Sequence, residues 1–98
     1  MPSAASPRTG APEEVIITAA GAAGHHARPQ VSERITVPLI RGSTRDLRRL
    51  QERTNLSRTD IVNRAITAYE FLDAKLKSGH DLIVRNRRTG ETQLVRFL

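Results

Sequence analysis

Residues 33–69 read ERITVPLIRGSTRDLRRLQERTNLSRTDIVNRAITAY and carry the clearest hydrophobic periodicity in the chain. An alternating segment leads into a short amphipathic pattern, a polar turn and a longer amphipathic pattern, which together predict one strand followed by two helices. One strand and two helices cannot enclose a core, because one face of the strand and its hydrogen-bonding edge have no cover. The stretch therefore predicts pairing with a second copy of itself.

The predicted strand occupies residues 34–39, where aliphatic side chains take every second position: Ile35, Val37 and Leu39. A period of two predicts a half-buried strand with these three side chains facing inward. Pro38 lacks an amide hydrogen, so it is tolerated at a sheet edge or in a two-stranded ribbon and disfavoured in a central strand. A ribbon formed by one strand from each of two chains satisfies both observations.

The first helix is expected from about residue 44 to residue 53, because Ser43 with Asp46 three residues later resembles a capping box. Leu47 and Leu50 mark its apolar face. The opposite face carries a row of arginines, which is either solvated or in contact with phosphate or a neighbouring dimer. The row consists of Arg45, Arg49 and Arg53.

The second helix is expected to begin after a turn at Asn55, where a left-handed residue is needed and Asn is the usual substitute for Gly. Ser57 is expected to cap it, with Asp60 completing a capping box. Its apolar arc spans about 160°, whereas a helix on a monomer surface needs only about 100°. The excess predicts two packing partners, the first helix of the same chain and the second helix of another subunit. The arc contains Ile61, Val62, Ala65, Ile66, Ala68, Tyr69, Leu72 and Leu76.

A second β signal follows the helices. Residues 82–85 and 92–97 flank the Gly-containing loop 86–91, a pattern that predicts a β-hairpin. The hairpin is basic, and two interpretations remain open: an appendage that stabilises the dimer, or an arm that contacts phosphate or a protein partner. Its basic residues are Arg85, Arg87, Arg88 and Arg96.

Residues 1–30 are rich in Ala, Pro, Ser and Gly, and they cannot bury enough apolar surface to offset the entropy of ordering. We expect most of them to be disordered, with the apolar island 15–18 as an unstructured tail segment, a transient strand or a partner-binding segment. No signal peptide or transmembrane helix is predicted. The expected organisation is a tail at 1–31, a mainly α domain with a short β-ribbon at 32–77, and the hairpin at 80–98.

Composition excludes several classes of protein. A chain of 98 residues forms one small domain, which buries only about 60 to 65 per cent of the surface of its unfolded chain. Cysteine is absent, which excludes disulfides and thiolate metal sites and is consistent with a reducing compartment. His25, His26 and His80 have no partner at ligand spacing, and the chain has little room for a pocket holding a nucleophile and a base. We expect no metal, no cofactor and no enzymatic activity.

The formal net charge is +6, and the positive excess lies in residues 33–98. Residues 34–64 alone contain eight arginines against three acidic residues, a net charge of +5. Such a compact basic region predicts an anionic partner, most commonly nucleic acid. Tyr69, Phe71 and Phe97 are too few and too scattered to form a base-stacking platform, which disfavours single-stranded nucleic acid and RNA loops.

The stretch from residue 34 to about residue 72 resembles ribbon-helix-helix proteins, the Arc repressor and MetJ superfamily. The resemblance rests on the alternating RITVPL segment, on Leu47 and Leu50, on the interval of 17 residues from Leu39 to Leu56, and on the NLSRTD turn and cap. It implies an obligate, intertwined homodimer whose paired strands enter the major groove of double-stranded DNA as an antiparallel β-ribbon.

By position, the base-reading side chains of that family correspond to Arg34, Thr36 and Pro38. Arg makes bidentate contacts with guanine, and Thr hydrogen-bonds a base edge or contacts the thymine methyl group. Pro38 departs from the polar or basic residue that is usual at the third position. Recognition is then expected either to be narrower or to rely more on shape and apolar contact, with Arg41 as a nearby charge.

The amino end of the second helix is the second expected DNA contact, because its free amides and the helix dipole attract a phosphate. The expected phosphate-binding residues are Ser57, Arg58, Thr59 and Arg41, although Ser57 can also serve as a helix cap alone. The expected dimer core comprises Ile35, Val37, Leu39, Leu47, Leu50, Leu56, Ile61, Val62, Ala65, Ile66 and Tyr69.

The resemblance implies a dimeric, sequence-specific transcriptional regulator, expected to be a bacterial repressor in the cytoplasm and associated with the nucleoid. A plasmid-partition role is a variant of this function. The alternative is an antitoxin-type module that neutralises a protein partner through a terminal extension, since 22 residues follow Leu76. The expected partners are double-stranded DNA, a second copy with higher-order assembly on DNA, and a protein bound by the extensions, but no membrane.

Overall fold

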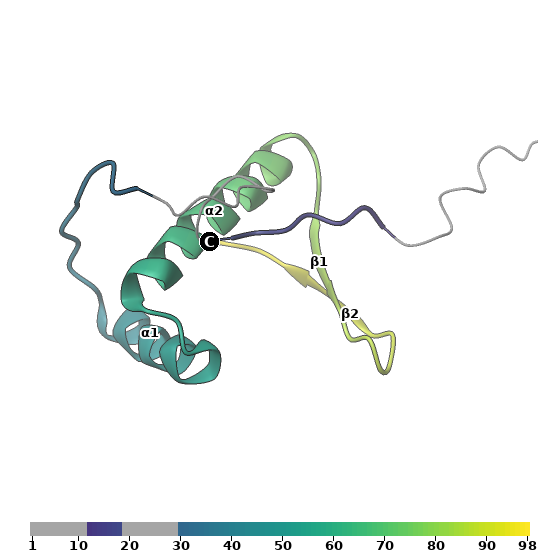
Figure 1. The fold of residues 1–98 in the computed structure, drawn as a ribbon. Coiled ribbons are helices and arrows are strands. Elements are labelled where there is room, and N and C mark those ends of the chain that lie inside the picture. Colours follow the sequence, from purple (N-terminus) through teal and green to yellow (C-terminus); the bar gives the residue numbers. More distant parts are fainter. Residues whose placement is uncertain (1–11, 19–29) are drawn as a thin grey trace, which may run out of the picture.

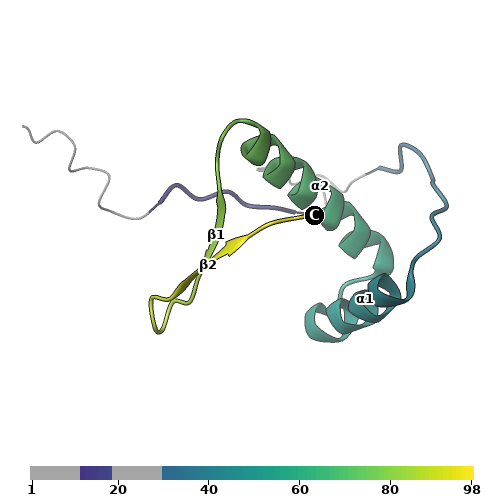
Figure 2. The same cartoon turned by 180° about the vertical axis from the view of Figure 1, so that it is seen from behind.

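The computed structural model describes residues 12–18 and 30–98. The predicted tail lies mostly outside this part of the chain, and His25 and His26 lie entirely outside it. The elements in order are α1 (Arg41–Thr54), α2 (Arg58–Lys77), β1 (Leu82–Arg85) and β2 (Thr92–Val95). They form a small mixed fold of two helices and one antiparallel two-stranded sheet. Figure 1 shows a short turn joining the two helices and the hairpin returning from the far end of α2, and Figure 2 shows the same arrangement from behind.

Helix α1 begins at Arg41, ahead of the start expected near residue 44. Ile40 is the cap residue, with extended backbone (φ −72°, ψ 163°), and no side chain caps the helix. The amide of Thr44 donates to the Ile40 carbonyl at 3.0 Å, which places Ser43 inside the first turn. The predicted capping box of Ser43 and Asp46 is therefore wrong. Gly and Ser cost only about 0.5 to 1 kcal/mol in a helix relative to Ala, too little to delay its start.

Helix α1 ends in the left-handed turn that the sequence predicts. Asn55 has φ 60° and ψ 22°, and its amide donates to the Gln51 carbonyl at 2.8 Å. The Thr54 hydroxyl donates to the Leu50 carbonyl at 2.6 Å and accepts from the Leu56 amide at 3.2 Å. The predicted left-handed conformation of Asn55 is confirmed. The Thr54 hydroxyl hydrogen-bonds to the backbone on both sides of the turn.

Helix α2 ends at Lys77 in a polar turn. Gly79 follows with φ 95°, and the His80 amide donates to the Lys75 carbonyl at 3.0 Å. The Lys77 ammonium group donates to the Asp73 carboxylate at 2.8 Å, and this hydrogen bond raises the pKa of Lys77 above its ordinary value. The chain then reverses direction into β1.

The predicted C-terminal hairpin is confirmed. β1 and β2 pair antiparallel, with Leu82 opposite Val95 and Ile83 opposite Leu94. The second strand is shorter than expected, since it ends at Val95 and leaves Phe97 outside the sheet. Leu82 and Val95 are half-buried, whereas Ile83 and Leu94 are about half exposed (51% and 52%).

Ile61 is the one buried residue among the described residues, with 7% of its surface exposed. Leu47 and Leu50 of α1 and Leu56 in the turn are half-buried, where α1 contacts α2. So small an interior makes this single chain marginal by itself.

Residues 30–40 contain neither a helix nor a paired strand. Figures 1 and 2 show them as a trace that runs to the start of α1 on the side of the helices opposite the hairpin. The ribbon predicted for this segment requires hydrogen bonds from another chain, so a single chain leaves that prediction open.

Candidate nucleic-acid interface

The candidate base-reading segment precedes α1. Arg34, Thr36 and Pro38 are all exposed. The intervening aliphatic side chains are exposed as well, at 63% for Ile35 and 58% for Val37. Leu39, next to the helix, is 47% exposed. Both faces of the segment are therefore open to solvent in a single chain.

The first turn of α2 brings Ser57, Arg58 and Thr59 together. The Ser57 hydroxyl accepts from the Asp60 amide at 3.0 Å, and the Ser57 carbonyl accepts from the Ile61 amide at 3.0 Å. Ser57 is thus confirmed as the helix cap. The amides at the start of a helix have no carbonyl acceptor within the helix itself. The amides of Arg58 and Thr59 are in this position, so they remain available to an external anion.

The electrostatics of this turn are mixed. The dipole of the 20-residue helix α2 places partial positive charge at its amino end, and the Arg58 side chain is exposed there. Asp60 contributes an acidic side chain to the same turn, but its residue is half-buried. Arg41 is exposed on another element, as the first residue of α1. An anion at the start of α2 would therefore be held chiefly by backbone amides.

The residues expected in the dimer core fall into two groups. One group packs within the chain and is buried or half-buried: Leu47, Leu50, Leu56 and Ile61. The other group is exposed: Ile35, Val37, Leu39, Val62, Ala65, Ile66 and Tyr69. The exposed members lie on the segment before α1 and along one side of α2. In this chain, intramolecular packing therefore uses only part of the apolar set.

The arginine row of α1 faces solvent, since Arg45, Arg49 and Arg53 are all exposed. Arg49 has an acidic neighbour, with its guanidinium 4.0 Å from the Asp46 carboxylate. Both side chains are about two-thirds exposed (65% and 68%), so this pair is screened and contributes little to stability. The row remains available to an anionic partner.

A contact that sequence reasoning missed joins α2 to the C-terminal segment. The ring centroids of Tyr69 and Phe97 lie 5.7 Å apart, with the planes inclined by 56°. Periodicity assigned Tyr69 to the second helix and Phe97 to the hairpin, and gave no signal that the two meet. Leu76 and Leu82, which flank the reversal, are half-buried. The wide apolar arc of α2 is therefore partly covered by the chain's own C-terminal segment.

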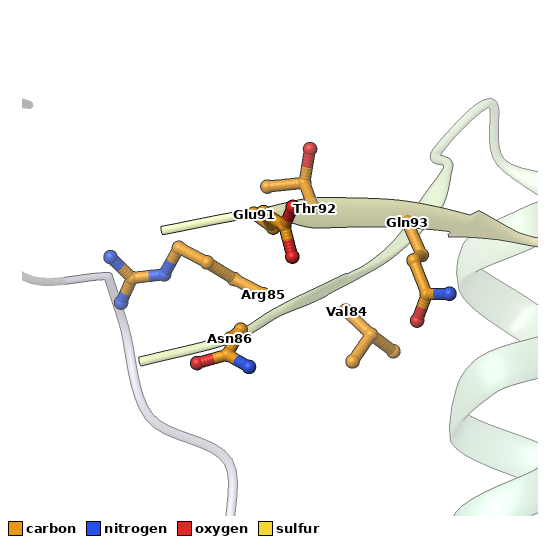
Figure 3. A pocket seen from close by; sticks show the side chains of 6 residues that line it. All are labelled: Val84, Arg85, Asn86, Glu91, Thr92 and Gln93. Carbon is orange, nitrogen blue, oxygen red and sulfur yellow. The ribbon is translucent and has the colours of Figure 1, made fainter. Parts of the chain in front are cut away.

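One open hollow lies on the hairpin and has a volume of about 550 Å³. It is lined by Val84, Arg85, Asn86, Glu91, Thr92 and Gln93. Figure 3 shows that these side chains diverge, with the Arg85 guanidinium extending away from the other groups. Such a hollow lacks the convergent polar groups of a small-molecule site.

Residues 12–18 and 30–98 contain no cluster of three or more side chains suited to hold a metal ion. Within the same ranges, neither helix has the length and apolar character needed to cross a membrane. His80 has a local role, because its Nδ1 lies 3.0 Å from the Ser78 hydroxyl and 3.1 Å from the Lys75 carbonyl.

The chain matches no protein-family model, no curated protein and no solved structure.

Proposed function

We propose that the protein is a ribbon-helix-helix-type homodimer that binds double-stranded DNA and regulates transcription. The observation that carries this proposal is the segment before α1, where Ile35, Val37 and Leu39 alternate and remain 63%, 58% and 47% exposed. An alternating segment with an uncovered aliphatic face and an unpaired backbone, followed at once by two packed helices, would be completed by a second copy of itself.

The energetics support the same pairing. Full burial of a Val, Leu or Ile side chain contributes about 1.5 to 3 kcal/mol. Three such side chains from each chain, each already partly shielded, would contribute several kcal/mol, a large share of the stability of a small domain. Val62, Ile66 and Tyr69 of α2 add a second exposed apolar surface for the same partner. We infer a dimer in which folding and association are one process.

Pairing of the segments would bring Arg34, Thr36 and Pro38 of both chains to one face of the ribbon. These side chains alternate with the aliphatic ones, so they point away from the dimer core. Arg34 is the residue suited to read guanine, and the first turn of α2 is suited to bind a flanking phosphate. Base contacts would specify the sequence and phosphate contacts would fix the position of the dimer.

DNA binding is tested with the full chain by fluorescence anisotropy on duplexes from the region upstream of its own gene, at several salt concentrations. Each phosphate contact should steepen the dependence of log K on log salt by roughly 0.9. Arg34→Ala should cost about 1 to 3 kcal/mol on the preferred sequence and relax discrimination at one base position. Arg34→Lys is the matched control, since it keeps the charge and loses the bidentate geometry. Affinity that is absent or insensitive to salt would contradict the proposal.

A second candidate function is an antitoxin-type module. The exposed cross-strand pair Ile83 and Leu94 favours it, because an apolar pair on a two-stranded arm is suited to a protein partner. Co-purification of the full chain with the product of a neighbouring gene tests this alternative. Loss of the complex in Ile83→Ser/Leu94→Ser, with DNA affinity unchanged, would support it.

A further inference from the structure

We propose that the tip of the C-terminal hairpin is a second DNA-contacting element, which binds the phosphate backbone beside the site occupied by the ribbon. This inference rests on the proposed function and extends the DNA surface to a part of the chain outside the ribbon and helices. The tip comprises residues 85–91.

The tip carries three exposed arginines, Arg85, Arg87 and Arg88, against the single acidic residue Glu91. None of the three forms an ion pair with an acidic side chain of residues 12–18 or 30–98. Glu91 follows in the loop, yet it lies outside ion-pair distance of Arg85, whose guanidinium extends away in Figure 3. The tip therefore presents an uncompensated positive charge of +2.

The backbone of the tip is fixed before any partner arrives. The Asn86 side-chain carbonyl accepts from the amides of Arg88 at 2.8 Å and Thr89 at 3.1 Å. The Asn86 amide donates to the Glu91 carbonyl, and the Gly90 amide donates to the Asn86 carbonyl, both at 2.7 Å. Gly90 permits this closure because its φ of 82° is strained for residues with a Cβ atom. A fixed loop reduces the entropy lost when its arginines bind.

The chemistry of the tip fits phosphate better than bases. The guanidinium group is planar and matches two phosphate oxygens, and it remains charged at all physiological pH values. The tip contains no aromatic side chain, so base stacking is excluded there. The loop amides of Arg88 and Thr89 already have acceptors, which leaves the side chains as the binding groups.

The location of the tip suits a flanking contact. Figures 1 and 2 show it as the end of the hairpin farthest from α2, projecting clear of both helices. The main basic region at residues 34–64 has the same sign of charge, so both surfaces attract a polyanion. A symmetric dimer has two tips, and they would contact the backbone on either side of the central site.

The test compares the full-length wild type with Arg87→Gln/Arg88→Gln on the same duplex. The double variant removes four arginines per dimer, so the slope of log K against log salt should fall by up to about 3.6 if each neutralises one phosphate. Hydroxyl-radical footprinting should show loss of the outer protected positions and retention of the central ones. Lys75→Gln/Lys77→Gln removes the same charge from exposed positions near the end of α2 and should leave the slope and footprint unchanged.

The outcomes separate the inference from the proposed function. A wild type that binds DNA with a slope and footprint unaffected by the double variant overturns the role of the tip and leaves the DNA-binding dimer standing. A wild type that binds no DNA overturns the proposed function itself. If the double variant keeps its DNA affinity but loses an acidic protein partner, the tip is a protein contact and the inference is wrong.

Discussion

Tyr69 on α2 and Phe97 beyond β2 form a tilted aromatic pair with ring centroids 5.7 Å apart. The pair joins the helical part of the chain to its C-terminal segment. Tyr69 is also one of the exposed apolar residues of α2, so the hairpin is anchored beside the surface proposed for dimerisation. Movement of the hairpin and the stability of the dimer are therefore expected to be coupled.

Phe97→Ala should loosen the hairpin without unfolding the helices. An aromatic pair of this geometry contributes about 0.5 to 1.5 kcal/mol beyond the area it buries. A double-mutant cycle with Tyr69→Ala, measured by urea unfolding, should give a coupling energy of about 1 kcal/mol. In hydrogen-exchange measurements, the backbone amides of β1 and β2 should exchange faster in Phe97→Ala than in the wild type. The amides of α1 should exchange no faster than the change in global stability requires.

Phe97→Leu is the control for that experiment, because it retains apolar bulk and removes the ring. It should weaken the coupling and leave the hairpin more protected than in Phe97→Ala. A coupling energy near zero would mean that Tyr69 and Phe97 are neighbours without mutual stabilisation.

Val37→Asp should abolish dimerisation and folding together. An unpaired carboxylate in the proposed ribbon core carries a desolvation cost of several kcal/mol, comparable with the whole stability of a small domain. Thr36→Asp is the matched variant, since it places the same group on the opposite face of the same segment. Sedimentation equilibrium and far-UV circular dichroism should show a folded dimer for Thr36→Asp, with weakened DNA binding, and an unfolded monomer for Val37→Asp. A dimeric Val37→Asp variant would exclude the ribbon.

Local signals predicted the parts of the fold that depend on neighbours in sequence. Asn55 and Ser57 take the conformations expected of them, because a left-handed turn and a helix cap are decided within a few residues. The hairpin is predicted equally well by its Gly-containing loop. Ser43 misled because it matches a cap pattern, yet the helix continues through it to the extended backbone of Ile40.

In the candidate site, too, the sequence predicted the local features and missed the long-range contact. The sequence placed Ser57, Arg58 and Thr59 together because they are consecutive. It could not place Phe97 against Tyr69, since that contact joins segments far apart in the chain and neither segment's periodicity encodes it. The proposed ribbon is a third case, because its partner strand would belong to another chain. The alternation of apolar and polar residues in this segment predicts only that such a partner is needed.

Ser57→Ala and Ser43→Ala should change the stability of the protein by different amounts or in opposite directions, although both remove a hydroxyl near the start of a helix. Loss of the Ser57 cap should cost about 1 kcal/mol, because the Asp60 amide loses its acceptor. Ser43 lies inside the first turn of α1, where Ala is a better helix former than Ser, so Ser43→Ala should be neutral or slightly stabilising. Thermal unfolding at fixed protein concentration measures both changes. An equal loss of stability in the two variants would show that Ser43 caps α1 in solution.

Asn55 supplies the remaining prediction, because it is the one residue other than glycine with positive φ among the described residues. Asn55→Gly should change stability by only a few tenths of a kcal/mol, since Gly adopts φ 60° without steric cost. Asn55→Ala should cost about 1 kcal/mol, because its Cβ atom crowds the following carbonyl in the left-handed conformation. Urea unfolding of the two variants at one protein concentration measures the difference. Since the turn sets how α1 meets α2, Asn55→Ala should also weaken DNA binding, whereas an Asn55→Ala variant as stable as Asn55→Gly would contradict the left-handed turn.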